Sequence, residues 1–131
     1  KLLAFSLRTP EGRWLLFRTV AWNVEGFEGV AVDQGLVEEA AKLICAPTAV
    51  YFEPAPRPLE EMKLTQTLAR ARVGFPEGFG DFPYYELLVG GRVDPPRELS
   101  YAKLDKDDRV IIIDPAPLLA LGKHLGEVCR P

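Results

Sequence analysis

The chain has 131 residues, of which 47% are hydrophobic and 27% are charged. This balance is typical of a folded domain with a buried core and argues against disorder as the main state, so we expect a single globular domain over residues 1–131. The formal net charge of −3 gives no overall attraction to phosphate, so a nucleic-acid contact would need a local cluster of Arg and Lys.

The two cysteines, Cys45 and Cys129, are too few for a disulfide framework and too far apart in sequence for a metal motif. No apolar run approaches the roughly 20 residues that a membrane helix needs, and residues 1–3 lack the features of a signal peptide. We therefore expect a cytoplasmic protein that makes no contact with a membrane.

The first predicted element is an antiparallel hairpin. Residues 2–8 alternate between apolar and polar positions, and residues 9–12 have the proline and glycine of a tight turn. Residues 13–22 carry apolar side chains at both alternating positions, which predicts a strand covered on much of both faces. Residues 30–32 predict a short third strand.

A helix comes next, with Asp33 as its predicted N-cap. The apolar residues that follow recur at helical spacing: Leu36, Val37, Ala40, Ala41 and Ile44. Residues 48–53 have the β-branched and aromatic side chains of a strand. A helix between two strands implies a crossover connection and at least one parallel pair of strands.

In the second half of the chain, a proline cluster leads into a predicted helix over residues 58–72. Residues 84–89 predict a strand, and the charged residues 92–108 predict a loop. Residues 110–113 predict a buried strand before a last helix, although the periodicity also allows a helix from Ile111 onward.

These elements predict a mixed α/β (α+β) domain whose sheet has about five strands, begins with an antiparallel hairpin, and is accompanied by about three helices. The order of the elements is similar to that of the RNase H-like fold. Three segments, residues 2–14, 50–54 and 114–121, resemble the first hairpin, the glutamate-bearing strand and the closing helix of RuvC-like resolvases.

The resemblance implies an RNase H-like fold with clustered carboxylates that hold two Mg²⁺ ions for phosphodiester cleavage. Ser6 stands where the family has its first aspartate, and Pro117 stands where another acid is expected. Only Glu53 and Asp114 remain as catalytic and metal-binding candidates, so the resemblance implies a decayed site. Apart from this magnesium site, we expect no cofactor. The structural interpretation is that Glu53 ends a strand and Asp114 caps a helix.

Other residues that could carry chemistry have simpler structural explanations. His124 is the only histidine and lies near the end of a predicted helix, where the helix dipole favours a cation. Cys45 follows an apolar helix face and is interpreted as a small buried residue. The carboxylates of residues 105–108 lack the spacing of a calcium loop and predict a solvated turn.

The segment of residues 75–85 is the strongest candidate for binding, because aromatic side chains between glycines and prolines are costly to leave in water. Its aromatic residues include Phe75, Phe79, Phe82 and Tyr84. Aromatic and arginine side chains anchor protein interfaces, and they also stack on single-stranded bases, with Arg70, Arg72 and Arg92 as phosphate partners. The alternative is a loop that folds onto the core.

The sequence therefore predicts a non-enzymatic protein-binding or regulatory module that docks on a larger assembly, for example a phage-type regulator of host transcription or DNA processing. A protein is the expected partner, and a nucleic acid bound by the local arginine and aromatic patch is the second. The alternative function is a RuvC-like metal-dependent nuclease that uses Glu53 and Asp114. A third class is a ligand-binding or structural oligomer, whose subunits could pair through an exposed edge strand such as residues 13–22.

Overall fold

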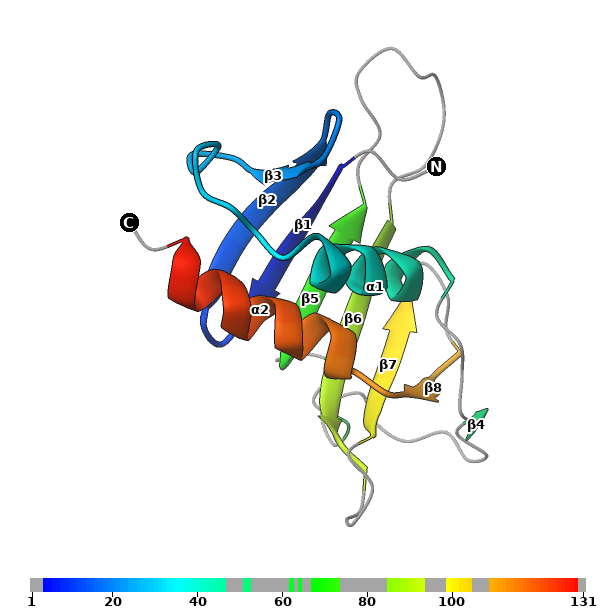
Figure 1. Cartoon of the computed structure of the whole chain (residues 1–131). Helices are drawn as coiled ribbons and strands as arrows, with labels where there is room; N and C mark the ends of the chain where they lie inside the picture. The colour runs from blue at the N-terminus through cyan, green and yellow to red at the C-terminus, as the bar shows by residue number, and fades with distance from the viewer. Residues whose placement is uncertain are drawn as a thin grey trace.

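The computed structural model describes residues 4–46, 51–52, 62, 64, 67–73, 85–93, 99–104 and 109–129. These residues form one sheet and two helices (Figure 1). The strands are β1 (Ala4–Thr9), β2 (Gly12–Arg18), β3 (Trp22–Val24), β4 (Tyr51–Phe52), β5 (Ala69–Val73), β6 (Tyr85–Arg92), β7 (Ser100–Leu104) and β8 (Ile111–Ile113). The helices are α1 (Gln34–Cys45) and α2 (Ala116–Val128).

The sheet has eight strands in the order β3-β2-β1-β5-β6-β7-β8-β4, and every described pairing is antiparallel. The predicted parallel pair is therefore wrong. After α1 the chain adds β4 at the far edge of the sheet, where it runs antiparallel to β8. The predicted α+β class is confirmed, but the described residues form more strands and fewer helices than the sequence predicts.

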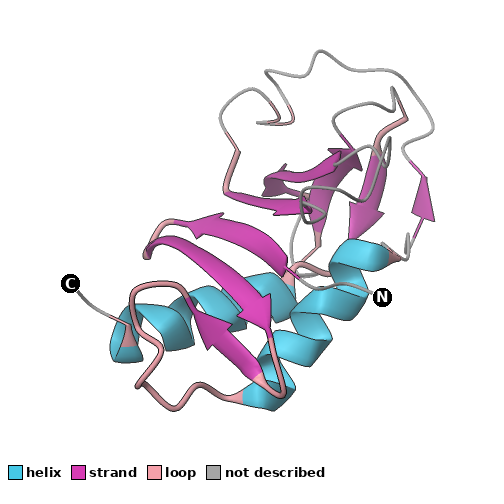
Figure 2. Ribbon diagram, turned by 90° about the horizontal axis from the view of Figure 1, so that it is seen from above, coloured by secondary structure: helices cyan, strands magenta, loops and turns pink. Residues whose placement is uncertain are grey.

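Both helices lie on the same face of the sheet, so the molecule has two layers (Figures 1 and 2). α2 contacts β1 and β2, and α1 packs against α2. A Cβ atom on Gly122 would lie 2.5 Å from the Thr9 hydroxyl, so glycine at this position allows α2 to approach β1 closely.

The core fills the space between these two layers. In β1 and β2 it takes every second residue, because successive side chains of a strand point to opposite faces. The buried side chains on the helix-covered face of the sheet include Phe5, Leu7, Trp14, Leu16, Trp22, Ala69, Ala71, Leu87, Val89, Ala102 and Ile113. The helices contribute Val37, Ala40, Ala41, Ile44, Leu118, Leu121 and Leu125.

The two helices are joined at their ends by polar contacts. The Asp33 carboxylate accepts a hydrogen bond from the Leu36 amide at 3.2 Å, which confirms the predicted cap of α1. The Asp33 amide in turn donates to His124 Nε2 at 2.9 Å. His124 therefore connects α2 to the beginning of α1, a role that the helix-dipole interpretation did not include.

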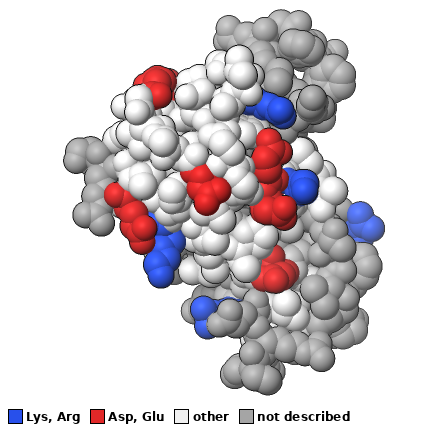
Figure 3. Space-filling model, viewed as in Figure 1, with Lys and Arg blue, Asp and Glu red and all other residues white. Residues whose placement is uncertain are grey.

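Both acidic and basic side chains are visible on the helix-covered face (Figure 3). The two helices and the residues that begin them contribute five carboxylates and two lysines, namely Asp33, Glu38, Glu39, Asp114 and Glu127 against Lys42 and Lys123. The helices are therefore net acidic, although Arg18 lies near Glu38 and Lys42 lies near Glu39 on this face.

Three predicted elements differ from the structure. The segment predicted to be the end of a helix forms strand β5, since Ala69 and Ala71 are buried while Arg70 and Arg72 lie on the other face. Part of the predicted loop forms β7. The third strand is Trp22–Val24 instead of residues 30–32, because the chain turns back at residues 19–21.

In the part of the chain that the structure describes, no helix has both the length and the apolar composition needed to span a bilayer.

Candidate functional site

The face of the sheet opposite the helices is covered at one end. Met62 and Leu64 pack there with Tyr101 and Ile112 in a second, smaller apolar cluster. The Gly91 amide donates to the Met62 carbonyl at 2.7 Å, and a Cβ atom on Gly90 would collide with that carbonyl. This cover lies over the half of the sheet that contains β6, β7 and β8.

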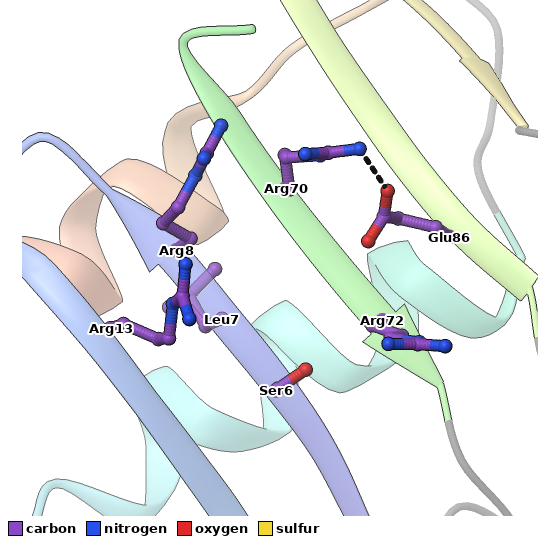
Figure 4. A pocket seen from close by; sticks show the side chains of 7 residues that line it. All are labelled: Ser6, Leu7, Arg8, Arg13, Arg70, Arg72 and Glu86. Atoms are coloured by element: carbon purple, nitrogen blue, oxygen red, sulfur yellow. Dashed lines mark ion pairs between the residues drawn. The ribbon is translucent and has the colours of Figure 1, made fainter.

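The other half of this face carries arginine side chains. We call the surface formed by Ser6, Arg8, Arg13, Arg70, Arg72 and Glu86 the arginine face, and these residues together with Leu7 line a hollow of about 230 Å³ (Figure 4). Strands β2, β1 and β5 are neighbours and supply the four arginines, while β6 supplies Glu86. Figure 4 shows Arg8 and Arg13 beside each other, while the Arg70 side chain extends toward Glu86.

The strand register explains why these residues meet. Arg8 lies directly opposite Arg13 on β2 and directly opposite Arg70 on β5, so the three residues form a row across the sheet. Ser6 lies two residues along β1, opposite Arg72. Because neighbouring strands are about 4.8 Å apart, the row of three arginines is about 10 Å long.

Within the arginine face, four guanidinium groups face one carboxylate. Arg70 Nη2 lies 2.7 Å from Glu86 Oε1, and Arg8 Nη2 donates to the Thr67 hydroxyl at 3.1 Å. Arg70 Nε is buried and has no hydrogen-bond partner among the residues that the structure describes. The backbone of Arg13 is held by β1 while its side chain is exposed.

This arrangement has an electrostatic cost. Like charges directly opposite each other on adjacent strands are destabilising, and Arg8 faces a like charge on both sides. The four guanidinium groups and Glu86 have a formal local charge of +3, in a chain whose net charge is −3. The arginine face is therefore a basic surface opposite an acidic one.

A second hollow adjoins the arginine face at Arg13, beside the edge of β2. β3 pairs with residues 16–18 of β2, and the Glu25 amide donates to the Leu15 carbonyl at 2.8 Å, so among the described residues β2 has no strand partner on that side only before Leu15. This second hollow, of about 270 Å³, is lined by Ser6, Arg13, Trp14, Leu15, Glu25 and Phe27. Ser6 and Arg13 line both hollows, so apolar surface directly adjoins the arginine face.

Two of the predicted binding residues, Arg70 and Arg72, lie on the arginine face. The aromatic candidates Phe75, Phe79, Phe82 and Tyr84 lie outside the described residues, as does the nuclease candidate Glu53. Arg92 is exposed at the end of β6 and does not line the hollow.

The prediction that Asp114 is the cap of the last helix is wrong in position, because the N-cap of α2 is Pro115 and Asp114 lies one residue before it. The Asp114 Oδ1 atom nevertheless accepts a hydrogen bond from the amide of Ala116, the first residue of α2, at 3.0 Å, so its contact is structural. Among the residues described, no group of three or more His, Cys, Asp or Glu side chains could hold a metal ion.

The two cysteines have opposite environments. The prediction that Cys45 is buried is wrong, because Ile44 occupies the buried position and the next residue of the helix points outward. Cys129 is buried, its carbonyl accepts from Trp14 Nε1 at 3.2 Å, and burial raises the pKa of its thiol above the usual value.

Arg8, Arg13 and Glu86 were not recognised as site residues from the sequence. A signal was present for the first two, since Arg8 and Arg13 flank the predicted turn of the first hairpin and must therefore face each other. The sequence did not predict that β5 and β6 supply residues to the arginine face, because the segment containing Arg70 has the pattern of a helix.

The fold and this surface define a two-layer α+β protein with helices on one face of an antiparallel sheet and an open, basic second face. Comparisons with protein-family models, with curated proteins and with solved structures find no match to this chain. The resemblance to RuvC-like proteins therefore stays a prediction.

Proposed function

We propose that this chain is a non-enzymatic binding domain that holds an anionic partner on the arginine face. The observation that carries this proposal is the register that places Arg8 opposite both Arg13 and Arg70. Such a row gathers positive charge that one carboxylate, Glu86, offsets only in part.

The chemistry of arginine favours binding over catalysis at this surface. A guanidinium group stays charged at all ordinary pH values, so it does not transfer protons, but its five N–H donors match the oxygens of phosphates and carboxylates. Several arginines on adjacent rigid strands would hold an anion in a fixed position. A bound anion would also relieve the repulsion between the opposed arginines.

The predicted aromatic segment fits the same proposal. Residues 74–84 connect β5 to β6, the two strands that carry Arg70, Arg72 and Glu86. Docking on a larger assembly through Phe79 and Phe82 stays a prediction, and so does a regulatory role in a reducing cytoplasm. In this proposal the arginine face supplies the charged half of the docking surface.

The proposal can be tested with an immobilised sulfated polysaccharide as a general polyanion. The natural chain should be retained and should elute only with added salt, because salt screens the contacts. The double variant R8Q/R13Q should elute at much lower salt. The matched control is Arg18→Gln, since Arg18 lies 3.8 Å from Glu38 of the helix layer and is not part of the arginine face. Equal elution of all three proteins would contradict the proposal.

A further inference from the structure

We infer that the anionic partner is a single-stranded nucleic acid, whose phosphates contact the arginine row and whose bases lie on apolar side chains of β2. The inference rests on the proposed function and identifies the partner by its chemistry. It depends on what lies beside the arginines on the same face of the sheet.

Apolar side chains continue the line of Arg13 along β2. Arg13, Leu15 and Phe17 alternate with the buried Trp14 and Leu16, and they lie opposite Arg8, Ser6 and Ala4 of β1. Leu15 is 39% exposed, which is unusual for a large hydrophobic side chain in this structure. Phe17 is half-buried and belongs to neither apolar cluster of the described residues.

This combination is what a single strand requires. Proteins that bind single strands combine a basic groove that follows the backbone with aromatic side chains on which bases stack. Phe17 comes four residues after Arg13 in β2, a distance of about 13 Å along the strand. The surface is therefore large enough for a few nucleotides, with phosphates at one end and a base at the other.

A duplex fits this molecule less well. The major groove of DNA admits a helix or a two-stranded ribbon, whereas the arginines lie on the flat face of a wide sheet. Both described helices lie on the opposite face (Figure 2), and they and the residues that begin them carry five carboxylates and two lysines. The unpaired bases of a single strand, in contrast, can lie flat on an open sheet, as they do in common RNA-binding modules.

An acidic peptide could form ion pairs with the arginines, but its carboxylates would have no favourable contact with the apolar side chains Leu15 and Phe17. Carboxylates and phosphates both accept bidentate hydrogen bonds from guanidinium groups, so Arg8, Arg13 and Arg70 alone do not separate the two partners. Phe17 and Leu15 distinguish a nucleic acid from an acidic peptide, since a planar base stacks on an aromatic ring and an acidic side chain does not.

The test is fluorescence anisotropy with four labelled probes of matched charge: a 12-nucleotide oligothymidine, the corresponding oligouridine, a DNA duplex and an oligoglutamate peptide. Both single strands should bind at least about tenfold more tightly than the duplex or the peptide. The logarithm of the binding constant should fall with the logarithm of salt concentration with a slope of about −2 to −3, since each phosphate contact in a single strand contributes about −0.7.

Variants separate the two parts of the surface. R8Q/R13Q should reduce the salt slope and weaken the binding of every probe. Phe17→Ala should weaken single-strand binding about tenfold and leave the salt slope unchanged, because stacking involves no counterion release. Phe17→Leu preserves an apolar side chain in case Phe17→Ala fails to fold, and Arg18→Gln is the control that should change neither quantity.

The results also distinguish the inference from the proposed function. If oligoglutamate binds as tightly as the single strands and Phe17→Leu has no effect, the partner is not a nucleic acid, although loss of binding in R8Q/R13Q would still support an anion-binding surface. If R8Q/R13Q binds all four probes as the natural chain does, both the inference and the proposed function are wrong.

Discussion

At the residue level, Arg13 faces a like charge on β1, and among the described residues it makes no ion pair, although Glu25 lines the second hollow with it. Its cross-strand neighbour is Arg8, whereas Glu86 lies 2.7 Å from Arg70 on the other side of β1. A residue in this position lowers the stability of the sheet, and a binding function would explain why the chain carries it. Function and stability are therefore expected to oppose each other at this position.

We expect Arg13→Thr to raise the free energy of unfolding by about 0.5 kcal/mol at low salt, because it removes a like-charge pair and introduces a β-branched residue into a strand. Urea unfolding measures this change. The gain should shrink at high salt, where the repulsion is screened. Arg18→Thr is the control, since that arginine lies near Glu38 and should give no gain. A less stable Arg13→Thr protein would contradict the argument.

The buried thiol of Cys129 predicts a loss of stability at alkaline pH. Because burial raises its pKa in the folded protein, the unfolded chain releases the thiol proton first as the pH rises above the usual value of 9.0. The contribution of this thiol is therefore fully present below that pH and is lost as the pH rises through the folded pKa. Between pH 8 and pH 10, Cys129→Ala should lose less stability than the natural chain, and an equal loss would show that the thiol does not contribute.

At the level of elements, the two helices depend on each other through one side chain. His124 Nε2 accepts from the Asp33 amide, and Asp33 caps α1, so the beginning of α1 is fixed by a residue of α2. We expect His124→Phe to destabilise the protein by about 1 kcal/mol, since Phe keeps a ring and a similar helix propensity but removes the acceptor.

Hydrogen exchange gives this prediction a specific readout. The Asp33 amide should exchange faster in His124→Phe, while amides in the middle of α2 should not change. Lys123→Gln alters the neighbouring exposed residue of α2 and should leave the exchange of Asp33 unchanged. If the Asp33 amide exchanges at the same rate in both variants, the contact does not hold the beginning of α1.

Elements whose signal is local could be predicted from the sequence, and elements that depend on tertiary pairing could not. The first hairpin, α1 and the last helix have clear periodicity or caps within a few residues. β5 has no such local signal, since Ala and Arg are strong helix formers. The alternation of Ala69, Arg70, Ala71 and Arg72 favours a strand only because β1 and β6 pair with this segment on either side. β7 was missed for the same reason, because its residues are covered by neighbouring strands and by Met62.

The candidate site was predicted in part, and the missing part follows from the missed pairing. Arg70 and Arg72 were proposed as phosphate partners, but Arg8 precedes Arg70 by more than sixty positions in the chain and meets it only through the β1–β5 register. The register between β1 and β5 cannot be predicted from the residues of either segment alone. The row of arginines is thus a property of the sheet and not of any one segment.

At the level of the whole molecule, charge is separated between the two layers. The helices and their first residues carry mostly carboxylates, while the arginine face lies on the other side of the sheet. The net charge of −3 is therefore unevenly distributed, and the arginine face is basic. Such a field orients an approaching polyanion toward the open face and repels it from the helices.

This separation leads to a kinetic prediction about the helix layer, which makes no contact with the proposed partner. The variant E39Q/E127Q neutralises two exposed carboxylates of the helices. It should raise the association rate constant for oligothymidine about twofold at low salt and leave the dissociation rate constant unchanged. The reason is that long-range charge acts on the encounter of the two molecules and not on the bound state. Arg13→Gln should instead raise the dissociation rate constant, since in the proposal Arg13 contacts the partner directly. Stopped-flow measurements at two salt concentrations separate these effects. The helix-layer effect should disappear at high salt, and a changed dissociation rate in E39Q/E127Q would mean that the partner contacts the helices instead of the open face.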